Sequence, residues 1–322
     1  MTFKISFVIC TYNNKKLVEK CINSILLQDY DKSKIEIITV DGGSTDGTLN
    51  ILKRFPVKII HNKKRFPEGK GMGKSQGIEK ASGDIIILLD QDNELINHNW
   101  LKNSIVPFTE DPKVFGCACK MSIDKNDTIT NRYLSMVGTD PFAIYRSLEG
   151  KMALNNIKLI NKGKYYIYDI NKEDMLCTGG NCFLIRKKCL DLINGYVQDV
   201  DMIYSLVLKN INRIAILKNT YIHHRTAKSY IGFLKKRWMW GKHYSFNNNE
   251  NRIYSWFPKK EEYLNFFIMI FLNLTFFYHF IVSLERYKKT KEVSWILHAP
   301  SMFFVTLFYI IFGISNLNKF IK

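Results

Sequence analysis

The feature that most constrains this chain is an apolar run that ends in two carboxylates. Residues 84–93 read Asp-Ile-Ile-Ile-Leu-Leu-Asp-Gln-Asp-Asn. A strand buried on both faces of a parallel sheet has this continuous apolar pattern, and ligand sites lie at the carboxyl ends of such strands. Because paired carboxylates bind divalent cations, Asp90 and Asp92 predict a cation site that would hold a diphosphate. The competing interpretation is an ordinary acidic turn.

The first hundred residues alternate between strand-like and helix-like patterns. Val18, Cys21, Ile22 and Ile25, for example, recur on one face of an expected helix. The order of elements predicts a parallel α/β sheet with right-handed crossovers. The expected strands are residues 4–10, 35–40, 57–61 and 85–89, and the expected helices are residues 15–28, 46–55 and 74–81.

The rest of the N-terminal two thirds is less regular. No clean period runs through residues 119–176. Beyond it we expect a glycine-rich turn and a strand within residues 177–190, a helix that begins near Asp199, and a short strand at residues 213–218.

The chain is strongly basic, which indicates a negatively charged partner. Its 322 residues include 47 Lys and Arg against 29 Asp and Glu, a formal net charge of +18. Phosphorylated substrates and anionic lipids fit this excess, and solvated surface lysines would account for part of it. No nucleic-acid-binding signature is visible, so nucleic acid is not expected as a partner. The seven cysteines form no zinc pattern and are expected to be reduced, as in a cytosolic domain.

Two uncharged segments near the C-terminus predict a transmembrane helical hairpin. Residues 263–284 and 293–317 contain no Asp, Glu, Lys or Arg. At 1.5 Å per residue, each is long enough to cross a hydrocarbon core of about 30 Å. Asn273, His279, His298 and Pro300 interrupt the apolar pattern. A shallow or re-entrant hairpin and a pair of buried helices in a soluble core therefore stay as alternatives.

Basic residues on both sides of these segments leave their orientation undecided. The connecting loop carries Arg286, Lys288, Lys289 and Lys291, and similar numbers precede and follow the hairpin. The preceding segment, residues 229–260, mixes Trp and Tyr with Lys and Arg, which suits a membrane headgroup interface. An ordinary amphipathic helix packed on its own protein is the alternative.

Polar motifs follow the expected strands and recur later in the chain. Together, over roughly residues 3–245, they resemble the inverting family 2 glycosyltransferases, which have the nucleotide-diphospho-sugar GT-A fold with a Rossmann-like mixed sheet. The motifs are Phe-Val-Ile-Cys-Thr-Tyr-Asn-Asn at 7–14, Ile-Thr-Val-Asp-Gly-Gly-Ser-Thr-Asp-Gly-Thr at 38–48, Gly-Met-Gly-Lys-Ser-Gln-Gly-Ile at 71–78, Asp-Gln-Asp at 90–92, Thr-Gly-Gly-Asn-Cys-Phe-Leu-Ile-Arg at 178–186 and Gln-Asp-Val-Asp-Met at 198–202.

The resemblance implies a nucleotide-sugar donor site. Tyr12 would stack on the base with Thr11 and Asn13 at the same strand end, and Asp41 would accept hydrogen bonds from the base or ribose. Gly42 stands where many relatives have a second Asp, so this chain departs from the family at the base contact.

The same resemblance implies contacts to the donor diphosphate and sugar. Lys74 stands where the family usually has Arg; it keeps a cation for the diphosphate but lacks the bidentate fork. Gly179 and Gly180 would let the backbone approach the donor sugar.

The implied cofactor is Mn²⁺ or Mg²⁺, both of which suit oxygen ligands and bridge carboxylates to phosphates. Asp90 would face the ribose and the metal, and Asp92 the metal and the diphosphate. Glu94, His223 and His224 are further candidate ligands; otherwise Glu94 is a solvated loop acid and the histidines are structural.

The implied catalytic base is Asp199, which would take the proton of the acceptor hydroxyl as that hydroxyl attacks the anomeric carbon. The family pattern usually reads Glu-Asp-x-Asp, and Gln198 replaces the Glu here. Asp201 is the competing acid, at the acceptor side or facing the helix dipole.

The implied acceptor side also includes a basic-aromatic element. Lys236, Arg237 and Trp238 resemble this element beside the family's acceptor cleft, although they lack its full Gln-x-x-Arg-Trp form. This departure argues against a processive polysaccharide synthase.

We therefore expect three regions: a GT-A catalytic domain at residues 1–228, a membrane-interface segment at 229–260 and a transmembrane hairpin at 261–322. The expected enzyme transfers a sugar to a lipid-linked acceptor, with its catalytic domain on the cytoplasmic face of the cell membrane. A polyprenyl(dolichyl)-phosphate glycosyl synthase and a non-catalytic basic binding protein are the alternatives.

Overall fold

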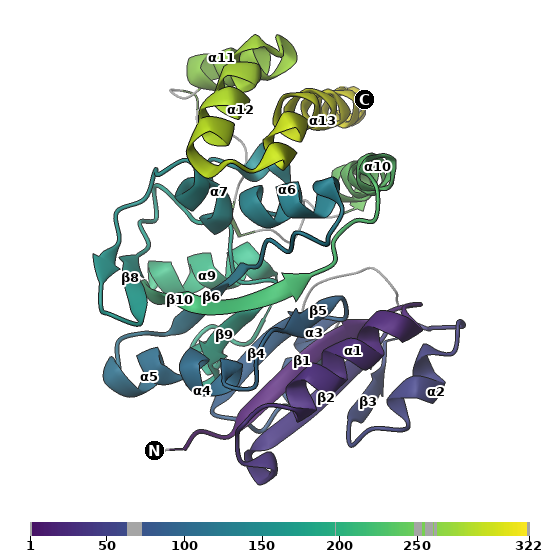
Figure 1. Ribbon diagram of the computed structural model, residues 1–322, viewed down its shortest axis with the longest axis vertical. Helices are drawn as coiled ribbons and strands as arrows, with labels where there is room; N and C mark the ends of the chain where they lie inside the picture. The colour runs from purple at the N-terminus through teal and green to yellow at the C-terminus, as the bar shows by residue number, and fades with distance from the viewer. Residues whose placement is uncertain are drawn as a thin grey trace. The chain divides into compact units, whose positions relative to one another are not determined.

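The computed structural model describes residues 2–62, 73–196, 198–247, 253–254, 260 and 263–320 (Figure 1). Contacts divide the chain into two compact units. Unit 1 contains Met1–Ser122 and Ile157–His224, and unit 2 contains Ile123–Asn156 and Arg225–Lys322. The expected boundary at residue 228 lies close to His224, after which the chain passes from unit 1 to unit 2. Residues 123–156 were expected within the catalytic domain, but they group with the C-terminal segment in unit 2.

Unit 1 begins with four parallel strands in the spatial order β3-β2-β1-β4. They confirm the expected parallel sheet for the first hundred residues. The apolar runs of β1, β2 and β4 are mostly buried, as expected for central parallel strands, whereas the edge strand β3 is only partly buried. These strands are β1 (Ile5–Thr11), β2 (Ile35–Asp41), β3 (Lys58–His61) and β4 (Ile85–Asp90).

The other half of the sheet is mixed, which agrees with the Rossmann-like mixed sheet that the resemblance implies. The spatial order continues from β4 as β9-β6-β10-β8-β7, with β5 paired to β10. Only the pair β6 and β10 is parallel among these neighbours. The strands are β5 (Asn93–Leu95), β6 (Gly116–Met121), β7 (Ile160–Asn161), β8 (Tyr165–Asp169), β9 (Phe183–Arg186) and β10 (Arg213–His224).

Helices cover both faces of the parallel strands. Alternate residues of β1 point to opposite faces, so Ile9 joins the core formed with α1. Val8 instead faces α3, where a Cβ on Gly77 would lie 2.4 Å from it, so only glycine allows this close approach. The helical elements of unit 1 are α1 (Lys15–Leu26), η1 (Lys32–Lys34), α2 (Thr48–Leu52), α3 (Lys74–Lys80), α4 (Trp100–Ser104), α5 (Val106–Glu110), α8 (Lys187–Asp191) and α9 (Asp199–Leu208).

Unit 2 is helical in its described residues. Its core joins residues far apart in the chain, including Tyr133, Phe233 and Trp295. Two of its helices lie in the segment that showed no clean period; Thr128 caps the first by accepting a hydrogen bond from the Asn131 N–H. The elements are α6 (Ile129–Val137), η2 (Pro141–Ala143), α7 (Leu148–Ala153), α10 (Tyr230–Asn247), α11 (Tyr263–Leu274), α12 (Phe277–Thr290), η4 (Val293–Leu297) and α13 (His298–Phe320).

The first predicted transmembrane segment is not one straight helix. It is broken into α11 and α12, which are bent by 75° relative to each other. Phe276, at the break, has a φ of 59°. Of the described residues, Val293–Phe312 forms one helical stretch long and apolar enough to cross a membrane, and the bent pair would add a second only as a single span.

Candidate active site

The carboxyl ends of β1 and β2 form a rigid polar edge around Asp41. This carboxylate is fully buried and accepts hydrogen bonds from its own loop, through the Gly43 and Ser44 N–H groups and the Ser44 hydroxyl. Thr11 Oγ1 also donates to it, at 3.2 Å. Asp41 therefore shapes the loop that would face a base, and its predicted contact with the donor stays a prediction.

Gln91 ties the ends of β1 and β4 together. Its side-chain amide accepts from the Tyr12 N–H and donates to the Tyr12 carbonyl, each at 3.0 Å. Asn13, next along the chain, has a φ of 43° and accepts from the Thr45 N–H. Gln91, between the two aspartates, thus fixes the backbone of the residues predicted to bind the nucleotide base. Sequence reasoning gave Gln91 no role.

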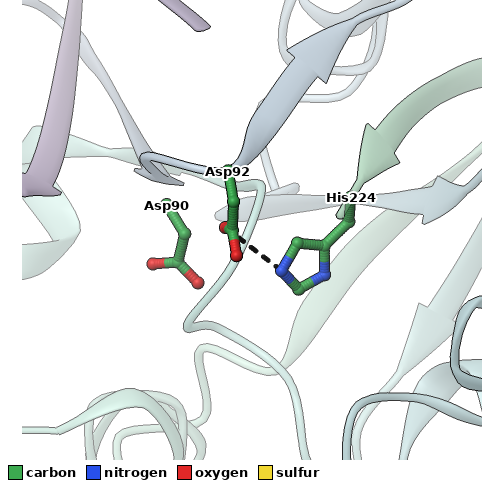
Figure 2. Close-up of side chains that lie close together, drawn as sticks. All are labelled: Asp90, Asp92 and His224. Atoms are coloured by element: carbon green, nitrogen blue, oxygen red, sulfur yellow. Dashed lines mark ion pairs between the residues drawn. The ribbon is translucent and has the colours of Figure 1, made fainter. Parts of the chain in front are cut away.

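Asp90, Asp92 and His224 converge at the ends of β4 and β10 (Figure 2). One ligand atom from each lies within 4.8 Å of the others. His224 is buried, and its Nε2 lies 3.3 Å from Asp92 Oδ1. Two carboxylate oxygens and an imidazole nitrogen are a donor set that fits Mn²⁺ and also accommodates Mg²⁺.

Strand pairing explains why His224 joins the aspartates. In the antiparallel pair β5–β10, Asn93 lies opposite His224 and Glu94 lies opposite His223. Successive side chains of a strand point to opposite faces, so Glu94 and His223 share the other face. Of the three further candidate ligands, His224 alone joins Asp90 and Asp92 in the cluster found among the described residues.

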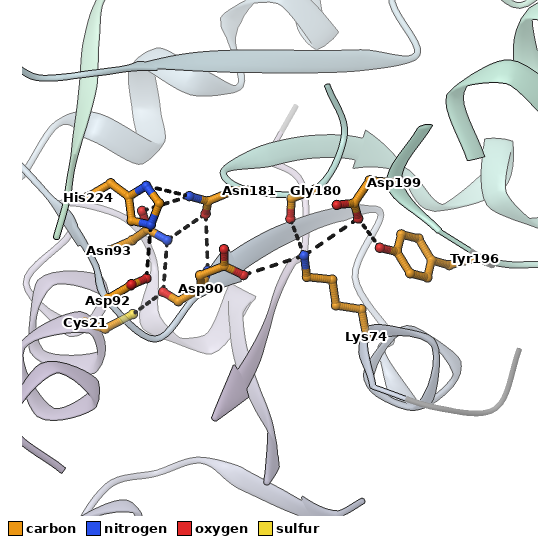
Figure 3. Close-up of polar contacts among 10 residues, drawn as sticks. All are labelled: Cys21, Lys74, Asp90, Asp92, Asn93, Gly180, Asn181, Tyr196, Asp199 and His224. Atoms are coloured by element: carbon orange, nitrogen blue, oxygen red, sulfur yellow. Dashed lines mark hydrogen bonds and ion pairs between the residues drawn. The ribbon is translucent and has the colours of Figure 1, made fainter. Parts of the chain in front are cut away.

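Asn181 holds this cluster from the glycine-rich turn (Figure 3). Its Oδ1 accepts from the Asp90 N–H at 3.3 Å and from Asn93 Nδ2 at 2.6 Å. Because a backbone N–H can only donate, this fixes the amide orientation, and Nδ2 faces His224 Nδ1 at 3.3 Å. His224 Nδ1 then accepts and Nε2 carries the proton toward Asp92. Nε2 would bind a metal only in the other neutral tautomer, with the proton on Nδ1.

Negative charge accumulates beside these aspartates. Burial and the carboxylates of Asp92, Asp90 and Glu94 raise the pKa of the Cys21 thiol. Cys21 lies under the site, with its Sγ 3.8 Å from the Asp90 carbonyl. A cation bound between Asp90 and Asp92 would offset this charge, as expected for a metal site.

Lys74 connects the aspartate cluster to the predicted base. This buried lysine, at the start of α3, donates to the Gly180 carbonyl at 2.6 Å. Its Nζ also lies 3.6 Å from Asp90 Oδ1 and 3.7 Å from Asp199 Oδ1. The sequence placed these residues in four separate motifs, and the fold brings them together (Figure 3). Gly71 and Met72 of the same motif lie outside the described residues.

Asp199 lies at the start of α9, against the glycine-rich turn. The Tyr196 hydroxyl donates to its Oδ1. A Cβ on Gly180 would lie 1.8 Å from Asp199 Oδ2, so a side chain there would collide with the carboxylate. Gly179 has a φ of 107°, which L-residues rarely adopt. The glycines of the turn therefore leave room for the Asp199 carboxylate, in addition to their predicted role beside the donor sugar.

Two predicted acceptor-side groups have other surroundings. Asp201 is fully buried within α9 of unit 1, which does not favour a contact with an acceptor. Arg237 pairs with Asp140 at 3.2 Å, and Trp238 packs edge-on against Phe308 and Phe312, all within unit 2. Lys236, beside them on α10, is partly exposed. Their acceptor roles stay predictions.

Sequence reasoning gave no role to four residues of this network: Gln91, Asn93, Asn181 and Tyr196. Three of them lie within or beside motifs that were recognised, so their position was available. Their roles depend on which side chain each faces, and a single sequence does not contain that information.

The fold matches a solved glycosyltransferase. A mannosyltransferase from Pyrobaculum calidifontis, solved with GDP-Man and Mn²⁺, superposes with a TM-score of 0.54 at 15% identity and covers 98% of this chain and 88% of its own. At this identity the likeness shows the fold alone. Unit 1 thus has the GT-A fold, as predicted.

Curated relatives match over shorter stretches. A Haloferax volcanii protein named Glycosyltransferase AglE is 33% identical over 106 residues, which is 31% of this chain and 34% of its own length. A Methanococcus voltae dolichyl N-acetyl-alpha-D-glucosaminyl phosphate 3-beta-D-2,3-diacetamido-2,3-dideoxy-beta-D-glucuronosyltransferase is 33% identical over 123 residues, 35% and 37% of the two chains. The chain thus spans about a third of the length of these relatives.

The family assignment rests on a longer match. The profile described as Glycosyl transferase family 2 covers residues 6–192, more than half of the 322-residue chain. This range contains the ends of β1, β2 and β4, Lys74 and the glycine-rich turn. The chain belongs to glycosyltransferase family 2.

Proposed function

We propose that this protein is a metal-dependent inverting glycosyltransferase that moves a sugar from a nucleotide-sugar donor to a lipid-linked acceptor. One observation carries the proposal: Asp90, Asp92 and His224 lie at the same sheet edge as Lys74 and Asp199. Such an edge is where ligands bind in open α/β sheets. Family membership argues against the alternative of a non-catalytic basic binding protein.

The donor diphosphate would be held by charge. Asp90 and Asp92, with His224 beside them, would hold Mn²⁺ or Mg²⁺, which would offset the charge of the diphosphate as it leaves. Lys74 Nζ adds a fixed cation next to Asp90. Tyr12 and Asn13, fixed by Gln91 and Ser44, would bind the nucleoside.

Asp199 would act on the acceptor. Its carboxylate takes the proton of the attacking hydroxyl, while Tyr196 and Lys74 hold Oδ1 in place. An inverting transfer needs a base on the side of the sugar opposite the leaving diphosphate. Asp199 lies on α9, whereas Asp92 follows the end of β4. The proposed base and the proposed metal ligand therefore come from different elements, which supports their separate roles.

The lipid-linked acceptor is supported by the relatives and by the apolar helices. The Methanococcus voltae relative is named for a dolichyl phosphate glycan, and a Campylobacter jejuni relative, 32% identical over 99 residues, is a GalNAc(5)-diNAcBac-PP-undecaprenol beta-1,3-glucosyltransferase. We extend this acceptor class to the present chain. The apolar helices of unit 2 support a location at the cell membrane, and the expected nucleotide-sugar donor is the reason to place the catalytic domain on the cytoplasmic face.

Transfer assays with point variants test this proposal. Purified protein would be given a panel of UDP- and GDP-sugars with Mn²⁺ or Mg²⁺ and a membrane lipid extract. We expect Asp92→Asn and Asp199→Asn each to lower transfer by at least about 10²-fold, because general-base and charge-stabilising groups contribute on that scale. Asp191→Asn, an exposed acid at the end of α8, is the matched control and should leave transfer unchanged.

The same assay separates a hydroxyl acceptor from a polyprenyl phosphate acceptor. A phosphate oxygen is already ionised and needs little help from a base. A mild effect of Asp199→Asn beside a severe effect of Asp92→Asn would therefore favour the polyprenyl-phosphate synthase. Full transfer activity in both variants would remove the proposed roles.

A further inference from the structure

Helices α11 and α12 and the turn η4 carry large apolar side chains on their outer side. Leu264 is 72% exposed, Phe277 70% and Phe271 66%. These elements contact one another in sequence, α11 with α12 and α12 with η4. A soluble monomer rarely exposes so much contiguous apolar area without a partner. We call this set the apolar surface; its other members include Phe267, Ile268, Phe280, Ile281, Leu284 and Ile296.

The inner side of the same helices is polar. Tyr133 OH lies 2.9 Å from His298 Nδ1, and His298 Nε2 lies 3.2 Å from His279 Nδ1. This series of hydrogen bonds continues from His279 Nε2 to Asn273 Oδ1 at 2.7 Å, and from Asn273 Nδ2 to Thr306 Oγ1 at 3.0 Å. All five side chains are buried. A hydrogen-bonded series of buried polar side chains between helices, with phenylalanines on the outer side of α11 and α12, suits helices that face lipid.

Helix α13, the longest apolar helix, packs on one side against other parts of unit 2. Tyr309, near its middle, donates to Asp140, which also pairs with Arg237 of α10. Gly241 of α10 approaches so closely that a Cβ would lie 2.8 Å from Phe312. A charged pair packed against the middle of a helix does not suit the hydrocarbon core. These contacts fix one side of α13 to α10 and η2 within unit 2.

Basic residues lie at the end of the apolar surface. Lys288, Lys289 and Lys291, which end α12 and follow it, are exposed. Because α11 and α12 are bent by 75°, the apolar chain can enter a leaflet and return without crossing it. The basic groups at both ends of the segment would then lie on one side of the membrane, which removes the conflict over orientation noted in the sequence.

We propose that α11, α12 and η4 form a monotopic membrane-binding surface. The apolar surface inserts into one leaflet of an anionic bilayer, Lys288, Lys289 and Lys291 contact its headgroups, and α13, which packs against α10, does not span. The proposal deepens the lipid-linked part of the proposed function, and it does not depend on the metal site or on Asp199.

Vesicle flotation with surface variants tests the insertion. The double variant Leu264→Asp/Phe277→Asp should lower affinity for phosphatidylcholine–phosphatidylglycerol vesicles by at least about 100-fold, because two large apolar side chains lose their burial. The control Leu192→Asp/Leu208→Asp changes leucines of unit 1 that are 55% and 53% exposed, and this double variant should bind like the parent. Equal vesicle binding by the two double variants would overturn the proposal. It would also be overturned if the parent bound no vesicles and Leu264→Asp/Phe277→Asp abolished its self-association, because the apolar surface would then bind a second copy of the chain.

A second variant tests the headgroup contact without risk to folding. Lys288→Glu/Lys289→Glu changes only exposed side chains. Affinity for vesicles with phosphatidylglycerol should fall by at least about ten-fold, with little change on pure phosphatidylcholine. An equal loss on both lipids, or none on either, would contradict the charge contact.

Membrane-impermeant maleimide labelling distinguishes a monotopic surface from a spanning helix. Lys289→Cys lies before α13 and Lys319→Cys lies in its last turn. We expect both cysteines to react from the same side of sealed membrane vesicles; labelling from opposite sides would show that α13 spans and overturn the proposal. Donor hydrolysis, measured on each variant, should be retained. Absence of any donor turnover in the parent, with vesicle binding intact, would instead contradict the proposed function alone.

Discussion

Lys74 links the two parts of the candidate site. A lysine ammonium offers three donors from one atom, and here it faces the Gly180 carbonyl, Asp90 and Asp199. The planar fork of an arginine would need paired acceptors in one plane. The substitution of Lys for the family's usual Arg therefore fits an arrangement in which the cation holds three groups in different directions.

Gly180→Ala tests whether the position of Asp199 matters. The added Cβ would meet Asp199 Oδ2 at 1.8 Å, so the carboxylate must move. We expect kcat for transfer to fall by at least about 10²-fold, since displacements near 1 Å at a reacting centre have effects of that size. The melting temperature measures folding, and Gly232→Ala on α10 is the control.

A double variant makes this prediction sharper. Because Gly180→Ala acts through Asp199, adding Asp199→Asn should lower transfer no further than Asp199→Asn alone. Independent, multiplying losses would contradict a shared mechanism.

Asp169 and Arg213 predict a pH dependence of stability. Arg213 donates to both carboxylate oxygens, at 2.8 and 2.9 Å, and these hydrogen bonds lower the pKa of Asp169. A lowered folded-state pKa stabilises the fold above about pH 4, and this contribution is lost as the pH falls through the folded-state pKa. The Asp169 side chain is 40% exposed, so the contribution is below about 1 kcal/mol.

Thermal denaturation of Asp169→Asn checks this contribution. The variant should melt slightly below the parent at neutral pH, and the two curves should converge in acid. A difference that stays constant across the pH range would show that the ion pair does not titrate as described.

At the scale of elements, strand ends bring the site together. β1, β2 and β4 run parallel, so Thr11, Asp41 and Asp90 lie at one edge. This much follows from the sequence, because buried apolar runs and polar motifs mark strands and their ends. The contribution of β10 does not follow from it. Its twelve residues were predicted as a short strand at 213–218, because polar residues after Leu217 hide its continuation to His224.

Gln91→Ala tests the coupling between β1 and β4. It removes two hydrogen bonds to the Tyr12 backbone, each contributing about 0.5–1.5 kcal/mol. We expect weaker nucleotide binding, with KM for the donor raised about ten-fold and a smaller effect on kcat. Gln91→Glu keeps the acceptor for the Tyr12 N–H and should lie between parent and Gln91→Ala. An unchanged KM in both would show that Tyr12 does not need this support.

At the scale of the whole molecule, the sequence predicted unit 1 better than unit 2. The GT-A fold and the motif residues followed from ordered motifs with local patterns. Residues 123–156 showed no clean period because α6 and α7 are short and their buried positions depend on α13, more than 140 residues later. The C-terminal segments were predicted as two straight spans, and that they cross a membrane stays a prediction. Composition could not show the break at Phe276, which divides the first segment into a bent pair.

Donor binding by isothermal titration calorimetry tests the central claim, that a cation held at Asp90 and Asp92 binds the donor diphosphate. UDP- and GDP-sugars would be titrated into the parent, Asp92→Asn and the control Asp191→Asn, each with and without Mn²⁺. We predict that Mn²⁺ tightens binding to the parent and to Asp191→Asn by at least about ten-fold and leaves Asp92→Asn unaffected. Equal tightening in all three proteins, or in none, would contradict the account.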